Sequence, residues 1–198
     1  MSSSLGRGEA VDDLPQARAI AMAHGITMAL AFLVLFPAGA IFIRVLNVKQ
    51  TMWIHASCQM IGWCLMLAGF ATGMRLREML GEMNHFHVII GMAIVAGMLL
   101  MPWFGYIHHR RYLVLRRKTT WTHTHVWFGR VLIILGIANG GIGFSLASED
   151  GVGYSRVGMI VYAAVAAVAG ISLVGLAIAV SFRGKGMEEE QLSLNHRG

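Results

Sequence analysis

Five long apolar segments, separated by short polar ones, set the pattern of the chain. They run over residues 19–46, 52–74, 86–107, 121–147 and 156–182. Each is long enough to cross about 30 Å of hydrocarbon, which takes roughly 20 helical residues. Because lipid offers the backbone no hydrogen-bond partner, segments of this kind cross membranes as helices. The pattern predicts an all-α integral membrane protein with five transmembrane helices, the first of them kinked at Pro37.

Composition fits a membrane protein and divides the chain into three parts. Hydrophobic residues make up 56% of it and charged residues 13%, which is about half the usual charged share. All 10 acidic residues lie outside the apolar segments. We therefore expect a polar N-terminal tail over 1–18, a transmembrane domain over 19–183 and a C-terminal tail over 184–198. No short apolar core with a cleavage site precedes the first segment, so we expect that segment to direct insertion itself.

Basic residues are distributed unequally between the two sides of the predicted bundle. The side that holds the loops after the first and third segments and the C-terminal tail carries Arg44, Lys49, Arg110, Arg111, Arg116, Arg117, Lys118, Arg183, Lys185 and Arg197. The opposite side carries Arg7, Arg18, Arg75, Arg77 and Arg156. The positive-inside rule then predicts an extracytoplasmic N-terminus and a cytoplasmic C-terminus, in the plasma membrane or an endomembrane. The net charge of +6 follows from this bias, so no nucleic-acid partner is indicated.

Four histidines lie a few residues inside an apolar segment, one in each of the first four: His24, His55, His87 and His125. Since consecutive helices run antiparallel, His24 and His87 share a depth near the outside, and His55 and His125 share one near the cytoplasm. An ionisable residue within the membrane is costly and is a functional candidate by default. Imidazoles that face each other across a helix bundle form bis-histidine haem sites. The pattern predicts two bis-histidine haem sites held by the first four helices, with the fifth helix peripheral.

Small residues on the same helical faces support the two haem sites. Gly91 and Gly129 follow His87 and His125 by four residues, which leaves room for a haem edge. Fourteen residues make nearly four turns, or about 21 Å, so positions fourteen after each histidine are expected to line the layer of the other haem. These positions are Ala38, Gly69, Met101 and Asn139. Gly73, eighteen residues after His55, lies on the same face again.

Three further side chains lie near the predicted ligands in the sequence: His85, His123 and Arg130. Residues two apart diverge by about 200° on a helix, so His85 and His123 cannot face inward together with the deeper His87 and His125. We expect His85 and His123 to be surface or entry-site groups. Arg130 lies five residues past His125, rotated from it by about 140°, and is expected to meet a haem propionate from another direction.

A basic rim surrounds the predicted cytoplasmic haem. It consists of Lys49, Arg110, Arg111, Arg116, Arg117 and Lys118. Positive charge of this kind attracts anions, so the rim is a candidate site for an anionic reductant such as ascorbate. Positive-inside topology alone is the alternative explanation for any one of these residues.

Several short motifs, taken together and in order, resemble the cytochrome b561 superfamily. They are Ala23-His24-Gly25, His55, His87-Val-Ile-Ile-Gly91, Gly105-Tyr-Ile-His-His109, His125-Val-Trp-Phe-Gly-Arg130 and Gly136-Ile-Ala-Asn-Gly-Gly-Ile-Gly143. The resemblance covers residues 20–182 and is closest to the five-helix, ferric-reductase-like branch found behind DOMON haem modules. No DOMON module is visible in this chain, and it has five predicted helices where ascorbate-dependent animal and plant members have six.

The resemblance implies one haem held by His24 and His87 and a second held by His55 and His125. It also implies electron transfer from a cytoplasmic, ascorbate-like reductant to an outside acceptor: a ferric chelate, monodehydroascorbate or a haem domain. An iron with two histidine ligands has no open position, so it changes only its oxidation state. The expected function is that of a transmembrane oxidoreductase.

Three alternatives to a free-standing reductase stay open from the sequence. One is a quinone-reactive di-haem anchor subunit, and another is an anchor module that serves a separate haem domain. The third is a transition-metal transporter that uses the same histidines. No acid lies within any span, whereas a transporter is expected to keep a carboxylate near the midplane. The oligomeric state is open as well.

Overall fold

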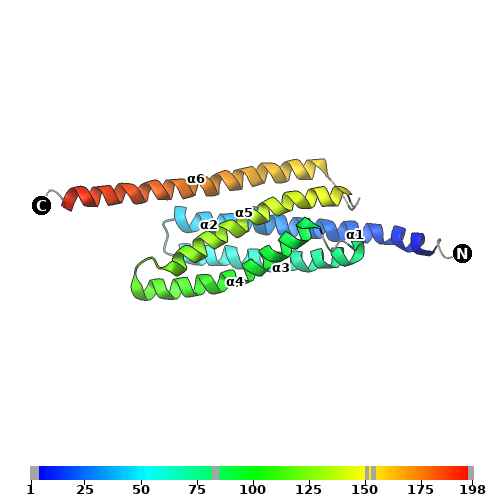
Figure 1. The fold of residues 1–198 in the computed structure, drawn as a ribbon, viewed down its shortest axis with the longest axis horizontal. Helices are drawn as coiled ribbons and strands as arrows, with labels where there is room; N and C mark the ends of the chain where they lie inside the picture. The colour runs from blue at the N-terminus through cyan, green and yellow to red at the C-terminus, as the bar shows by residue number, and fades with distance from the viewer. Residues whose placement is uncertain (1–4, 82–84, 150–151, 153–154, 196–198) are drawn as a thin grey trace.

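The computed structural model describes residues 5–81, 85–149, 152 and 155–195, with side chains left out at 5–13, 177 and 180–195. Described residues form helices and short connections, with no strand among them. The helices are α1 (Leu5–Ala29), η1 (Leu30–Leu35), α2 (Phe36–Val45), α3 (Thr51–Leu80), α4 (Phe86–Leu115), α5 (Thr120–Glu149) and α6 (Arg156–Asn195) (Figure 1). Of the basic residues used for the topology prediction, Arg197 lies outside the described residues, and Arg7, Arg183 and Lys185 have no described side chain.

Among the described residues, five helices are long and apolar enough to cross a membrane. They are Leu14–Val45, Thr51–Leu80, Phe86–Leu115, Thr120–Glu149 and Arg156–Leu176. The prediction of five transmembrane helices in an all-α protein is thus confirmed. Most of the helices are longer than their apolar runs, because a helix does not need to end where the hydrocarbon ends; its polar last turns continue the backbone hydrogen bonds.

The helices form two closely packed antiparallel pairs and one outer helix. The first pair joins α3 with the continuous helix made of α1, η1 and α2, and the second joins α4 with α5. Contacts between the two pairs are sparse. In Figure 1, α6 runs along one edge of the bundle beside α5 and extends past it at the C-terminal end. Its contacts with α2 and α5 are few and most of its side chains are exposed, so it is the peripheral helix that the sequence predicted.

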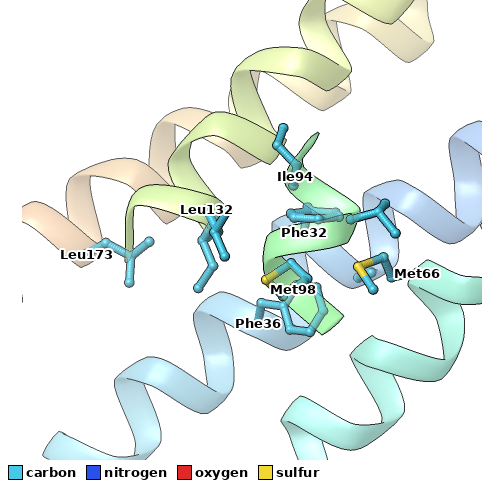
Figure 2. Close-up of a cluster of buried hydrophobic side chains, with 10 residues drawn as sticks. Phe32, Phe36, Met66, Ile94, Met98, Leu132 and Leu173 are labelled. Atoms are coloured by element: carbon cyan, nitrogen blue, oxygen red, sulfur yellow. The ribbon is translucent and has the colours of Figure 1, made fainter. Parts of the chain in front are cut away.

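A slab of buried side chains joins the two pairs at mid-height. Figure 2 shows Phe32, Phe36, Met66, Ile94, Met98, Leu132 and Leu173 pointing toward one another from several helices. Phe36 is 1% exposed and Met66 is fully buried. Each of the first four spans carries one of the four histidines near one end. Near its other end, each span carries residues that contact a histidine of a different span, and the slab lies between the two. The core therefore separates two levels of the bundle.

The first span contains a π-turn at its centre. In η1 the backbone N–H of Phe36 donates to the carbonyl of Ala31, five residues back, whereas an α-helix bonds four residues back. A π-turn of this kind holds one residue more than the α-turn it replaces. Pro37, the second residue of α2, has no N–H to donate. The structure therefore has a π-turn that ends at Leu35, two residues before Pro37, and the kink at Pro37 stays a prediction.

A second proline frees a carbonyl that a neighbouring helix uses. Pro102 lies inside α4 and cannot donate to the carbonyl of Met98, four residues back. The indole N–H of Trp63, on α3, donates to this carbonyl over 3.3 Å. The bond ties the two helix pairs together at the level of the core, where few other contacts join α3 and α4.

Candidate functional site

Two histidines from different helix pairs face each other near one end of the bundle. His24 on α1 and His87 on α4 have ring centroids 5.9 Å apart, with the ring planes at 90°. Each ring also reaches a backbone carbonyl of the helix packed beside it. Nδ1 of His24 lies 2.8 Å from the carbonyl oxygen of Gly69 on α3, and Nδ1 of His87 lies 2.9 Å from that of Asn139 on α5.

These carbonyl contacts decide where the imidazole protons are. A carbonyl oxygen can only accept, so Nδ1 of His24 and of His87 must each carry the hydrogen. In a neutral imidazole the other nitrogen, Nε2, then has a free lone pair. Histidines that bind metals are oriented in this way, with one ring nitrogen donating to a carbonyl and the other facing the metal.

A second pair lies near the opposite end, on the remaining two helices. His55 on α3 and His125 on α5 have ring centroids 6.3 Å apart, with the planes at 82°. Nδ1 of His55 donates to the carbonyl of Gly39 on α2 over 2.8 Å. Nδ1 of His125 is buried and has no hydrogen-bond partner among the described residues. Three of the four imidazoles are therefore fixed by a carbonyl.

Glycines make the room that three of the imidazoles occupy. A Cβ added at Gly73 would lie 2.7 Å from Nδ1 of His24, and one at Gly143 would lie 2.8 Å from Cε1 of His87. At Gly105 the distance to Cε1 of His125 would be 3.2 Å, which is tight but less severe. Only glycine allows the helix backbones to come this close to the rings.

The His55/His125 pair has additional polar neighbours. The ring of His108 stacks on that of His125, with centroids 5.9 Å apart and planes at 18°. Nδ1 of His108 lies 3.0 Å from the hydroxyl oxygen of Thr122, which holds the stacked ring in place. Spacing along the chain does not connect His108 with His125, since seventeen residues and a turn separate them.

A half-buried arginine, Arg44, lies near His55, and a second one, Arg130, lies near Arg44. The charges of Arg44 and Arg130 act on each other, and that of Arg44 also acts on His55. The guanidinium of Arg130 lies 4.8 Å from the ring centroid of Trp127, a cation–π distance. This end of the bundle therefore concentrates positive charge within the membrane-spanning part of the chain.

Gly69 and Asn139 lie on the inward faces that their spacing predicted, each supplying a carbonyl to a histidine of the other level. In the first span the acceptor is Gly39, where the spacing had pointed to Ala38. Gly91 lies close to Nδ2 of Asn139, at the contact between α4 and α5.

Gly129 likewise lies at that contact, close to the methyl of Met101. The six residues of the basic rim are all exposed, in the turn after α2, at the end of α4 and in the turn after it. They lie at the end that holds His55 and His125. No group of three or more His, Cys, Asp or Glu side chains that could hold a metal ion occurs in the described part of the chain.

Three of the curated proteins that match the chain share one description. Three cytochrome b561 and DOMON domain-containing proteins of Arabidopsis thaliana are similar to it. The first is 29% identical over 153 residues, which cover 71% of the chain and 36% of the relative. The second is 28% identical over 66% of the chain and 33% of the relative, and the third is 31% identical over 59% and 30%.

The chain thus spans about a third of the length of these relatives. No protein-family model matches it, and no solved structure matches it either. The similarity to the three plant proteins agrees with the all-helical, five-span architecture. Over the matched residues, the chain is thus similar to cytochrome b561 and DOMON domain-containing proteins.

Proposed function

We propose that the chain binds two b-type haems, one between His24 and His87 and one between His55 and His125, and transfers electrons across the membrane. The observation that carries the proposal is the pair of facing imidazoles at each level. The similarity to cytochrome b561 and DOMON domain-containing proteins supports a b-type haem as the cofactor. The number of haems and their ligands rest on the geometry of the four histidines.

The ring separations fit a shared iron atom. Imidazole nitrogens bind metals at about 2 Å, and a ring nitrogen lies about 1.1 Å from the ring centroid. Two imidazoles on one iron therefore have centroids about 6 Å apart, against 5.9 Å for His24/His87 and 6.3 Å for His55/His125. A bound haem would supply one-electron redox chemistry, and two histidine ligands would leave its iron no position for substrate.

The protein's own part is to fix the ligands. Carbonyls of Gly69, Asn139 and Gly39 hold three imidazoles in the tautomer that keeps Nε2 free. Outer contacts of this kind raise the basicity of a ligand and hold its orientation. Since the ligand imidazoles are neutral, they add no charge to the low-dielectric interior, where a charge is costly.

Positive charge beside the His55/His125 pair suits the carboxylates of a haem. Arg130 and Arg44 both lie near this level, and arginine binds carboxylates through paired N–H groups. We assign both as propionate contacts of this haem. Arg130 is the residue that the sequence predicted, and Arg44 reaches the site from the other helix pair.

The basic residues indicate the direction of electron transfer and the end at which the reductant binds. The basic rim lies at the His55/His125 end, so the positive-inside rule makes this the cytoplasmic end and puts the N-terminus outside. An ascorbate-like anionic reductant would then bind at Lys49, Arg110, Arg111, Arg116, Arg117 and Lys118. The acceptor outside is a ferric chelate, monodehydroascorbate or a haem domain. The matched relatives are named for a DOMON domain, which favours the haem domain among these.

The first test is a reduced-minus-oxidised absorption spectrum of the purified chain, with haem and protein quantified together. The proposal expects a narrow low-spin b-type band and about two haems per chain. His24→Ala and His55→Ala should each remove one haem and leave the other, while His123→Ala, on an exposed residue, should remove neither. A folded but colourless protein would refute the haem assignment, and transition-metal transport through the same histidines would then be tested instead.

A further inference from the structure

The histidines and their carbonyl acceptors keep a constant spacing in two spans and a different one in the first. On α3, Gly69 follows His55 by fourteen residues; on α5, Asn139 follows His125 by fourteen. Both stretches are regular α-helix. In the first span the acceptor Gly39 follows His24 by fifteen residues. Each of these residues serves a histidine of the other level, so every one of the three helices carries a ligand and an acceptor on one face.

One extra residue matters because it changes helical phase. Fourteen residues of α-helix end about 40° short of four full turns, and fifteen end about 60° beyond them. In a regular α-helix, Gly39 would thus be rotated by about 100° from the direction that Gly69 and Asn139 share. The stretch between His24 and Gly39 contains η1, whose wide turn absorbs one residue without that rotation.

We infer that the π-turn at Leu30–Leu35 is a register device: it absorbs the fifteenth residue, so that His24 faces one level and the Gly39 carbonyl faces His55 at the other. The inference rests on the proposed function for the role of the histidines as ligands. The π-turn makes Gly39 the positioning residue for His55, in place of Ala38.

Close packing at Gly39 shows why the register must be kept. A Cβ added there would lie 2.6 Å from Nε2 of Gln59 and 3.1 Å from Cβ of Cys58, both on α3. The backbone of α2 is therefore in direct contact with α3 at this residue. A rotated helix would bring Ala38 or Ala40 to this contact and would turn the Gly39 carbonyl away from His55.

Proline alone does not account for the π-turn. Pro37 follows η1, but α4 contains Pro102 and remains an α-helix throughout. On α4, Gly105 adjoins the ring of His125 and follows His87 by eighteen residues, as Gly73 follows His55 and Gly143 follows His125 in regular α-helix, so α4 has no extra residue to absorb. The π-turn thus occurs in the span whose spacing is one residue longer.

The test is a single deletion that should be harmless only at the π-turn. Val34 lies in η1 and is 45% exposed; Ile61 lies midway between His55 and Gly69 in regular α3 and is 55% exposed. Deletion of Val34 should convert η1 to α-helix with the phase unchanged and keep about two haems per chain. Deletion of Ile61 rotates one end of α3 by about 100° and should lose at least one haem. Equal haem loss in both variants would overturn the inference.

A disulfide reports the register without haem. In a Cys64→Ser, Gln59→Ala background, which removes the amide that a Cβ at residue 39 would meet, Gly39→Cys should form a disulfide with Cys58 on mild oxidation and lose both free thiols. The two Cβ positions adjoin at 3.1 Å, and a shift of roughly half an ångström brings them into the disulfide range. Ala38→Cys should not form it. The same result is expected after deletion of Val34, and a loss of the Gly39→Cys disulfide in the deleted chain would contradict the register device. Absence of haem in the unmodified chain would refute the proposed function, while this measurement would still decide the role of the π-turn.

Discussion

The imidazole of His24 fills the space that a side chain at Gly73 would occupy, since a Cβ there would lie 2.7 Å from Nδ1. The contact joins α1 to α3 one turn beyond the residue whose carbonyl holds the same ring. The position of the ring thus depends on a glycine of the neighbouring helix as much as on its own backbone.

Gly73→Ala should therefore displace His24 and weaken the haem that His24 shares with His87. We expect occupancy to fall from about two haems per chain toward one, measured as the haem-to-protein ratio. Gly25→Ala is the matched control, because a Cβ there meets nothing within 4 Å. Full retention of both haems by Gly73→Ala would show that the ring contact does not constrain the site.

His85 and His87 should behave differently although only one residue separates them. His85 is the N-cap of α4, and its Nδ1 accepts a hydrogen bond from the backbone N–H of His87 over 3.2 Å. His85→Ala should cost about 1 kcal/mol of stability, as loss of a cap does, and leave both haems bound. His87→Ala should remove one haem. Spectra and urea unfolding in detergent measure the two effects, and loss of haem in His85→Ala would contradict this division of roles.

The bond between Trp63 and the Met98 carbonyl should depend on Pro102. Trp63→Phe removes the indole donor and is expected to destabilise the protein by about 1 kcal/mol. In a Pro102→Ala background the new N–H can bond to Met98 within α4, so the same substitution should cost clearly less. A double-mutant cycle of unfolding free energies gives this coupling. Strict additivity would mean that Pro102 does not free the carbonyl for Trp63.

The hydroxyl of Tyr162 should hold α6 to the bundle. It donates to the carbonyl of Ile137 on α5 over 2.6 Å and lies against Gly140. Tyr162→Phe should lower stability by about 0.6 to 1 kcal/mol, the usual range for such bonds in membranes and in water, with both haems retained. Tyr106→Phe, at a residue that is 60% exposed, should change neither. Loss of haem in Tyr162→Phe would give α6 a part in the site.

Hydropathy and antiparallel order predicted much of this arrangement. Five spans follow from the length of the apolar runs, and the structure places His24 beside His87 and His55 beside His125. Their roles as ligands stay predictions. The fourteen-residue spacing also pointed to Gly69 and Asn139, because regular α-helices keep phase over that length.

Other features have no signal in spacing or hydropathy. The π-turn shifted the acceptor from Ala38 to Gly39, and sequence alone marks its place only by Pro37 nearby. The choice of a carbonyl as the partner of Nδ1 in His24, His55 and His87 depends on how closely two backbones approach. The stacking of His108 on His125 likewise depends on side-chain directions across α4 and α5, which periodicity does not define.

The small number of contacts between the two helix pairs has a consequence for biogenesis. Each pair is one uninterrupted hairpin of the chain, residues 14–80 and 86–149, so each can leave the insertion machinery as a finished unit. With haem seated as proposed, every iron takes one ligand from each hairpin and clamps the halves together at both ends of the core. Ligand binding stabilises the assembled state by mass action, so cofactor supply would set how much of the newly made chain escapes membrane proteases.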